Sequence, residues 1–179
     1  MFQTIEYLKF GNERQRKAYS AIHYLGIMKE LGDYTPVLCG TLPIGIDIEG
    51  SDLDIILEVN DFNQFKERVE YLYKDKQEFR IKQTIIRNVP VIKANFMFGG
   101  FEFELFGQPQ PVYEQYAYIH MLIEYHLMME TPQLREKVIA LKQQGYKTEP
   151  AFCKALGLEG DPYETLIESG EKLKLLRRT

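Results

Sequence analysis

Hydrophobic and polar residues alternate along several short stretches of the chain, and this alternation predicts β-strands. In one stretch, Leu53 and Ile55 fall on one face of a strand while Asp52 and Asp54 fall on the other. The Gly99-Gly100 pair separates two alternating runs and is a strong signal for a hairpin turn. Strands are therefore expected at residues 37–39, 52–59, 78–87, 91–98 and 101–106.

Apolar residues at helical spacing mark most of the remaining chain. In the first such segment, Asn12 is a suitable N-cap and Gly32 a suitable C-terminal stop. Helices are expected at residues 12–31, 61–74, 112–129, 132–144 and 149–156. A last helix is expected to start at Asp161-Pro162 and to end among the cations of residues 172–178.

The order of these elements predicts an α+β fold, in which a mixed β-sheet carries helices on one face and a helical C-terminal part follows. The pattern changes near Gln108–Pro111, which suggests a core of residues 1–108 and a helical region of residues 109–179 packed on it. With 179 residues, 45% of them hydrophobic, the chain is long enough and apolar enough to bury an ordered core.

The charge balance and the cysteines narrow the class of protein. The net charge is −4 and the isoelectric point about 5.5, which argues against extended nucleic-acid binding because that needs a basic surface. No apolar run approaches the roughly 18–20 residues of a membrane span, and the N-terminus lacks the charge order of a signal peptide. The two cysteines are not spaced like metal ligands, and we expect them to be reduced thiols. Reduced thiols are typical of cytoplasmic proteins, so a cytoplasmic location is expected.

The polar face of the predicted strand 52–59 carries two aspartates. Asp52 and Asp54 are two positions apart, which places them about 6.5–7 Å apart along the strand. Two carboxylates so close repel each other unless a cation lies between them. Because aspartate is also uncommon in strands, we predict a magnesium site here, with a solvated strand face as the alternative.

A Gly-Thr pair lies between the predicted strands 37–39 and 52–59. Gly40 would let the backbone approach a phosphate closely, and Thr41 would offer an N–H and a hydroxyl. Ser51 would add another hydroxyl, so these three residues form the predicted nucleotide- or phosphate-binding set. A sharp turn after a buried strand is the alternative explanation for Gly40. The conformation of loop 41–50 stays open, although its alternation suggests an extended segment.

The Gly40-Thr41 pair, followed roughly ten residues later by Asp52-Leu53-Asp54, resembles the signature of the nucleotidyltransferase superfamily, which has the polymerase-beta-like fold. From Arg14 through His126 the chain also resembles an uncharacterised bacterial family of that superfamily, and it resembles the related GrpB-like proteins. The resemblance implies transfer of a nucleotidyl group from a nucleoside triphosphate to an unknown acceptor, a small molecule or a protein. It also implies Mg²⁺ as the cofactor, with a two-metal site as one arrangement.

In this superfamily a third carboxylate comes from a neighbouring strand, and in this chain Glu104 and Glu102 are the candidates. Glu104 is preferred because it lies nearer the end of strand 101–106, and Glu102 is the alternative. The resemblance therefore implies that Asp52, Asp54 and Glu104 are the metal ligands and catalytic residues. Solvated glutamates are the competing interpretation, because polar side chains on an outer face are normal in antiparallel sheets.

Two departures from the superfamily pattern leave catalytic activity open. Thr41 replaces the usual serine or glycine, and the loop after it is apolar, with Leu42, Pro43, Ile44 and Ile46. One alternative is a catalytically degenerate protein that binds a nucleotide or a partner, such as a toxin–antitoxin component. Another is a phosphohydrolase that uses the same metal pair.

Histidine and glutamate also occur at helical spacing in the C-terminal part. His120 and Glu124 are four positions apart and share a face of the predicted helix 112–129. Their arrangement is not the HExxH motif of zinc enzymes, so partly buried packing is favoured over a metal role.

Overall fold

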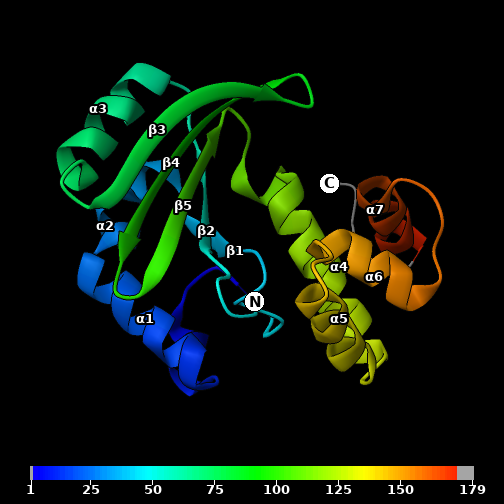
Figure 1. Ribbon diagram of the computed structural model, residues 1–179. Helices are drawn as coiled ribbons and strands as arrows, with labels where there is room; N and C mark the ends of the chain where they lie inside the picture. Colours follow the sequence, from blue (N-terminus) through cyan, green and yellow to red (C-terminus); the bar gives the residue numbers. More distant parts are fainter. Residues whose placement is uncertain (1, 173–179) are drawn as a thin grey trace.

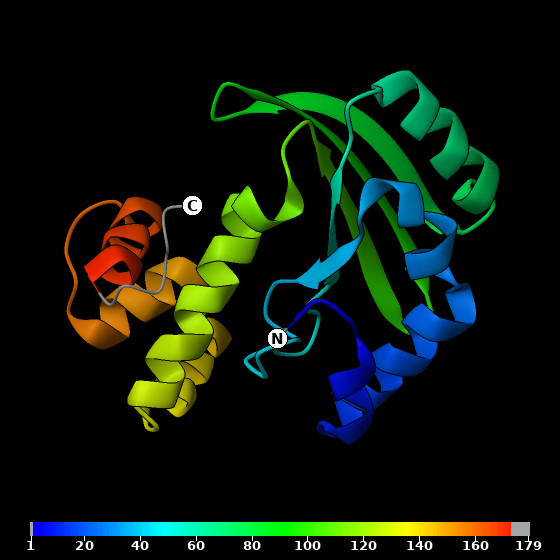
Figure 2. The ribbon, with the colours of Figure 1, turned by 180° about the vertical axis from the view of Figure 1, so that it is seen from behind.

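The computed structural model describes residues 2–172 and contains a five-stranded mixed β-sheet between two groups of helices (Figure 1, Figure 2). The strands are β1 (Val37–Cys39), β2 (Leu53–Glu58), β3 (Gln77–Ile86), β4 (Val89–Phe98) and β5 (Phe101–Gln108). Their order in the sheet is β1-β2-β5-β4-β3. Strand β2 pairs with β5 in parallel and the other neighbours are antiparallel, so the predicted mixed sheet is confirmed.

Helices α1 to α3 cover one face of the sheet, and α4 to α7 lie on the other side of it (Figure 1). Their bounds are α1 (Glu13–Leu25), α2 (Ile27–Glu30), α3 (Phe62–Tyr73), α4 (Tyr116–Glu130), α5 (Leu134–Gln143), α6 (Thr148–Leu156) and α7 (Pro162–Lys172). Short 3₁₀ helices are η1 (Glu6–Phe10), η2 (Gly32–Tyr34) and η3 (Val112–Glu114). Each predicted helix has a counterpart here. The basic run predicted for residues 173–178 lies outside the described residues.

The first helix is not continuous as predicted, because it is broken at Gly26. This residue has φ 70°, a left-handed conformation that glycine adopts at little cost, and its N–H donates to the carbonyls of Ile22 and His23. The short helix α2 then begins in a new direction and buries Ile27. Helical spacing alone did not reveal the break, because the apolar positions continue across it.

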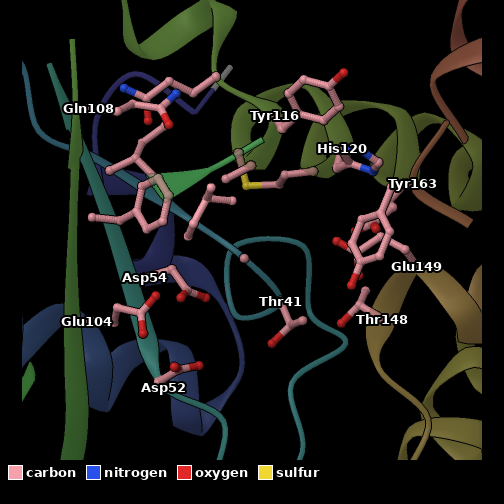
Figure 3. Close-up of a pocket in the computed structure, with 18 of the residues that line it drawn as sticks. Thr41, Asp52, Asp54, Glu104, Gln108, Tyr116, His120, Thr148, Glu149 and Tyr163 are labelled. Atoms are coloured by element: carbon pink, nitrogen blue, oxygen red, sulfur yellow. The ribbon is translucent and has the colours of Figure 1, made fainter. Parts of the chain in front are cut away.

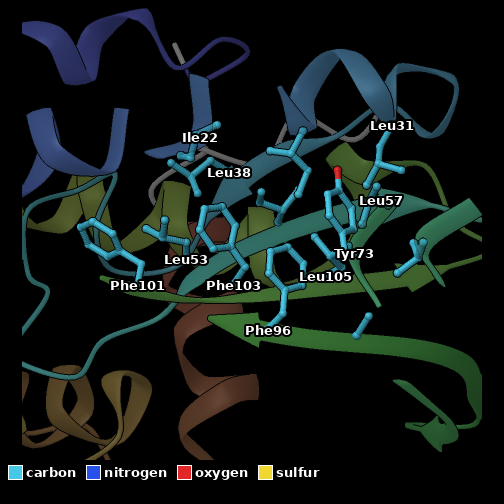
Figure 4. Packing of buried hydrophobic residues seen from close by; sticks show 14 of the residues in the cluster. Ile22, Leu31, Leu38, Leu53, Leu57, Tyr73, Phe96, Phe101, Phe103 and Leu105 are labelled. Carbon is cyan, nitrogen blue, oxygen red and sulfur yellow. The ribbon is translucent and has the colours of Figure 1, made fainter. Parts of the chain in front are cut away.

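The alternation of β2 and β5 builds the main core between the sheet and helices α1 to α3 (Figure 4). Leu53, Ile55, Phe103 and Leu105 are fully buried there. The rings of Phe96 and Phe103 stack with their centroids 5.3 Å apart. Because one face of β2 and β5 is buried in this core, their opposite, polar face points toward α4 to α7.

A second hydrophobic cluster joins the sheet to the C-terminal helices. It contains Ile46 and Ile56 from the first part of the chain and Met121, Ile123 and Phe152 from the helices. The two regions therefore pack against each other, while their boundary as domains at residue 108 stays a prediction. Among the described residues, no helix is both long enough and apolar enough to cross a membrane.

Loop 41–50 is a compact series of turns and does not form the extended segment that its alternation suggested. Its apolar side chains, Leu42, Ile44 and Ile46, are buried in the two clusters. Its backbone is held from both sides: the Gln15 amide donates to the Leu42 carbonyl over 2.9 Å, and Arg135 donates to the Gly45 carbonyl over 2.9 Å. The apolar composition of the loop thus reflects core packing.

The N-terminus of α1 supports this loop, and Asn12 caps it as predicted. The Asn12 side chain accepts from the Gln15 N–H, and the Gln15 side chain accepts from the Asn12 N–H, which is a capping box. Arg14, in the first turn of the same helix, forms an ion pair with Asp47 over 2.8 Å and donates to the Ser51 carbonyl over 2.9 Å. Loss of the cap should therefore weaken both the helix and the attachment of the loop.

We expect Asn12→Ala to lower the free energy of unfolding by about 1 kcal/mol, because an N-cap acceptor is lost. For a chain of this size the melting temperature should fall by roughly 2–4 °C, measured by circular dichroism. Asn63→Ala is the matched control, since Asn63 is exposed in the first turn of α3 and Asp61 provides the cap there. Equal melting temperatures for the two variants would contradict this role of Asn12.

Candidate metal and nucleotide site

A cavity of about 590 Å³ lies between the sheet and the C-terminal helices (Figure 3). Cavities of about 300–1,000 Å³ are typical of small-molecule sites. On the sheet side its wall includes Gly40, Thr41, Ser51, Asp52, Asp54 and Glu104. On the helical side the wall includes Tyr116, His120, Glu124, Lys142, Glu149 and Tyr163. All of the predicted site residues except the alternative Glu102 thus border one cavity.

The parallel pairing of β2 with β5 brings the predicted carboxylates together. Asp54 lies directly opposite Glu104 in the register of these strands. Asp52 precedes Asp54 by two residues and lies on the same side of the cavity, as Figure 3 shows. The antiparallel register of β1 places Cys39 opposite Asp54, so Gly40 follows immediately beside the carboxylate pair.

Gly40 approaches Asp54 so closely that a side chain would not fit. A Cβ atom at Gly40 would lie 2.1 Å from the Oδ2 atom of Asp54. The residue also has φ 77°, a conformation that side-chain-bearing residues rarely adopt. Glycine is therefore required here for close contact with the carboxylate as well as for the turn.

The two candidate glutamates of β5 have different surroundings. The Oε2 atom of Glu104 lies 2.7 Å from the Lys93 ammonium and accepts from the Asn95 amide over 3.3 Å. Glu102 is instead held by Arg80 and by Asn95, over 2.5 and 3.0 Å, and is not part of the cavity wall. The geometry groups Glu104 with Asp52 and Asp54, although their role as metal ligands stays a prediction.

Ser51 borders the cavity but also shapes the loop before it. Its hydroxyl oxygen accepts from the Ile48 N–H over 3.0 Å, and its carbonyl accepts from Arg14. The hydroxyl proton is left for another acceptor. Thr41 is half-buried in the same wall.

Burial and mutual repulsion raise the pKa values of the two aspartates. Burial is the largest cause for Asp54, and the charges of Asp52 and Glu104 add to it, so that its pKa rises to about 8. The pKa of Asp52 is also raised, by burial and then by Glu104 and Glu102. Lys93 opposes both shifts. A divalent cation among these oxygens would reverse the effect, because it favours the ionised carboxylates.

The three carboxylates are not the tightest group of metal-ligating residues in residues 2–172. His120, Glu124 and Glu149 are the group whose ligand atoms all lie within 4.8 Å of one another. Asp52, Asp54 and Glu104 are not such a group in this part of the chain.

The wall of the cavity contains residues that sequence patterns did not single out. Lys142 of α5 is buried, and burial lowers its pKa while Glu124 and Asp47 raise it. Arg87, at the tip of the β3–β4 hairpin, lies 4.2 Å from the Tyr116 ring and 5.1 Å from the Tyr163 ring. No local signal marks these residues, because they meet only when the hairpin and the helices fold together.

The raised pKa of Asp54 should make the stability of the metal-free protein depend on pH. Its folded-state pKa of about 8 exceeds the ordinary value of 3.8, so the folded state binds this proton more tightly. The free energy of unfolding therefore falls as the pH rises between these two values. Asp54→Asn removes this titration, so its melting temperature relative to wild type should increase from about pH 5 to about pH 8 in a chelating buffer.

The control for this measurement is Glu58→Gln, on the same strand but outside the cavity wall. Its melting temperature should keep a constant difference from that of wild type over the same range. A constant difference for Asp54→Asn as well would contradict the assigned cause.

Solved structures with a similar fold include two that are described as a poly(U) polymerase and an RNA terminal U-transferase. The Cid1 poly(U) polymerase with bound MgGTP aligns with a TM-score of 0.57 and 15% identity, over 84% of this chain and 54% of the polymerase. The GLD-2/RNP-8 complex aligns at 0.55 and 19% identity, over 96% of this chain and 66% of that one. A cytoplasmic RNA terminal U-transferase aligns at 0.52 and 18%, over 78% and 46%.

At such low identity these similarities show the fold alone, and it is the expected fold of the nucleotidyltransferase superfamily. The chain spans about half the length of the Cid1 polymerase. The finer resemblance to GrpB-like proteins stays an expectation. A search of curated proteins gave no match. A family model does match residues 20–169, and the chain therefore belongs to the family described as "Domain of unknown function (DUF4269)".

Proposed function

We propose that this protein is a magnesium-dependent nucleotidyltransferase that moves a nucleotidyl group from a nucleoside triphosphate to a small molecule or a protein. The observation that carries the proposal is the in-register pair Asp54 and Glu104, with Gly40 held bare against the Asp54 carboxylate. The fold shared with the Cid1 poly(U) polymerase supports it.

The donor set suits magnesium, which prefers carboxylate oxygens and keeps several waters. Asp52, Asp54 and Glu104 would hold the ion or ions. Burial first, and then the neighbouring carboxylates, raise the pKa values of both aspartates, and a cation would offset the negative charge of the group. When bound, magnesium would neutralise charge that develops on the phosphate oxygens during transfer.

The phosphates would be bound from two walls of the cavity. On the sheet side, the donors would be the backbone N–H groups of Gly40 and Thr41 and the hydroxyls of Thr41 and Ser51, because these residues border the cavity. Lys142 offers a cation from the helical side. The apolar loop does not oppose phosphate binding, because Leu42 and Ile46 are buried in the core.

In the proposed transfer, the acceptor hydroxyl oxygen forms a bond to the α-phosphorus while the bond from this phosphorus to the β-phosphate oxygen breaks. Pyrophosphate leaves with the electron pair, and the hydroxyl proton passes to a carboxylate. Glu104 is our candidate for this base through its Oε1 atom, because Lys93 and Asn95 hold its Oε2 atom. The acidic chain and the walled cavity favour a compact acceptor over an extended nucleic acid.

Nucleotide binding and nucleotide transfer are the direct tests of this proposal. Calorimetry with each nucleoside triphosphate and Mg²⁺ should show binding, and α-labelled triphosphate should transfer its label to an acceptor in a metabolite or protein extract. Asp54→Asn should reduce the transfer to background. Binding without transfer would favour the degenerate binder, and hydrolysis without transfer would favour the phosphohydrolase. Absence of binding at millimolar triphosphate would contradict the proposal.

Magnesium should also stabilise the wild-type fold through these carboxylates. An ion that binds only the folded state adds about 1.4 kcal/mol at ten times its dissociation constant, which raises the melting temperature by roughly 3–5 °C. Asp54→Asn and Glu104→Gln should lose this response, whereas Glu102→Gln should keep it because Glu102 lies outside the cavity wall. The same measurement with K⁺ in place of Mg²⁺ is the control for general screening of charge repulsion by salt. Equal shifts in wild type and Asp54→Asn would show that the assigned site is wrong.

A further inference from the structure

A second cluster of ligand-type side chains lies on the helical wall of the cavity, across from the carboxylates of the sheet. His120 and Glu124 come from α4, and Glu149 comes from the first turn of α6. One nitrogen or oxygen atom of each residue lies within 4.8 Å of those of the other two. Figure 3 shows His120 and Glu149 on the side of the cavity away from Asp54 and Glu104.

Two of these side chains are buried and carry polar atoms that have no hydrogen-bond partner. His120 is 4% exposed and Glu124 is 3% exposed. Neither ring nitrogen of His120, nor the Oε1 atom of Glu124, has a hydrogen-bond partner. Buried polar atoms in folded proteins are nearly always satisfied, so several unsatisfied atoms at one point indicate a missing partner.

The surrounding protein groups do not supply that partner. Tyr116 and Tyr163 contact the His120 ring at centroid distances of 5.8 and 5.9 Å, which fixes the ring but leaves its nitrogens unpaired. Lys142 is the nearby buried cation. Yet within residues 2–172 no ion pair joins it to Glu124 or Glu149.

We propose that His120, Glu124 and Glu149 bind a divalent transition-metal ion of the zinc class, at a site separate from the carboxylates of the sheet. Imidazole nitrogens and carboxylate oxygens are both ligands of zinc, and sites with three protein ligands take a water in the fourth position, which the cavity would supply here. Ligand atoms around a tetrahedral zinc ion are about 3.4 Å apart, so small side-chain rotations would close the present cluster. Magnesium is disfavoured here because it prefers oxygen ligands.

The ion would join α4 to α6. These two helices are separated by α5 in the sequence and make few direct contacts with each other. Helix α6 contacts α5 and α7 closely, and both of these helices contact α4. The metal would therefore fix the helical wall that faces the predicted nucleotide site. This role does not require that the protein transfer nucleotides, so the two proposals can fail independently.

The test uses the purified full-length chain after removal of metal with a chelator. Titration with Co²⁺ should give the visible absorption of a low-symmetry, four-coordinate site, and Zn²⁺ should bind with a stoichiometry of one and displace Co²⁺. Excess Mg²⁺ should leave Co²⁺ bound. Glu149→Gln and His120→Gln should each weaken Co²⁺ binding by at least about tenfold.

His126→Gln is the matched control, because His126 is exposed on the same helix and has the same side chain. It should bind Co²⁺ as wild type does, and circular dichroism should show that all three variants are folded. Should a variant fail to fold, Glu124→Gln replaces it, because this change keeps the shape of the buried side chain. The proposal is overturned if Co²⁺ and Zn²⁺ do not bind, if Mg²⁺ displaces them, or if His120→Gln and His126→Gln bind them equally.

Discussion

The parallel pairing of β2 with β5 is the constraint on which the rest of the structure depends. It sets Asp54 opposite Glu104 and places Asp52 beside them, so negative charge gathers at one point of the sheet. Such a gathering is unfavourable without cations, and it adds to burial, the larger cause, in raising the pKa of Asp54. Lys93 relieves part of it through its ion pair with Glu104.

The carboxylates cannot separate easily, because their strands are anchored on the opposite face. Leu53 and Ile55 alternate with the aspartates and are fully buried beneath α1 to α3. A one-residue slip of β2 would expose these side chains and bury the aspartates, so the hydrophobic pattern fixes the register. The core therefore fixes the positions of the strands and, through them, of the charges.

Local patterns predicted the strands well, because a period of two and the signals for turns act over a few residues. The same reasoning placed Asp52 and Asp54 on one face and Glu104 on the polar face of its own strand. It could not pair β2 with β5, which are some fifty residues apart, so that neighbour relation rested on the family resemblance. The break at Gly26 was missed because the helical pattern continues on both sides of it.

The helical wall shows most clearly what a linear pattern leaves out. His120 and Glu124 share a turn of one helix, and in isolation they are better explained by packing. Glu149 joins them only because α6 folds back against α4 through α5 and α7. A ligand set completed from another helix has no signature in spacing, so it becomes visible through unsatisfied buried atoms, here both nitrogens of His120. One wall of the cavity therefore carries carboxylates whose positions depend on strand register. The other wall carries candidate metal ligands whose positions depend on helix packing.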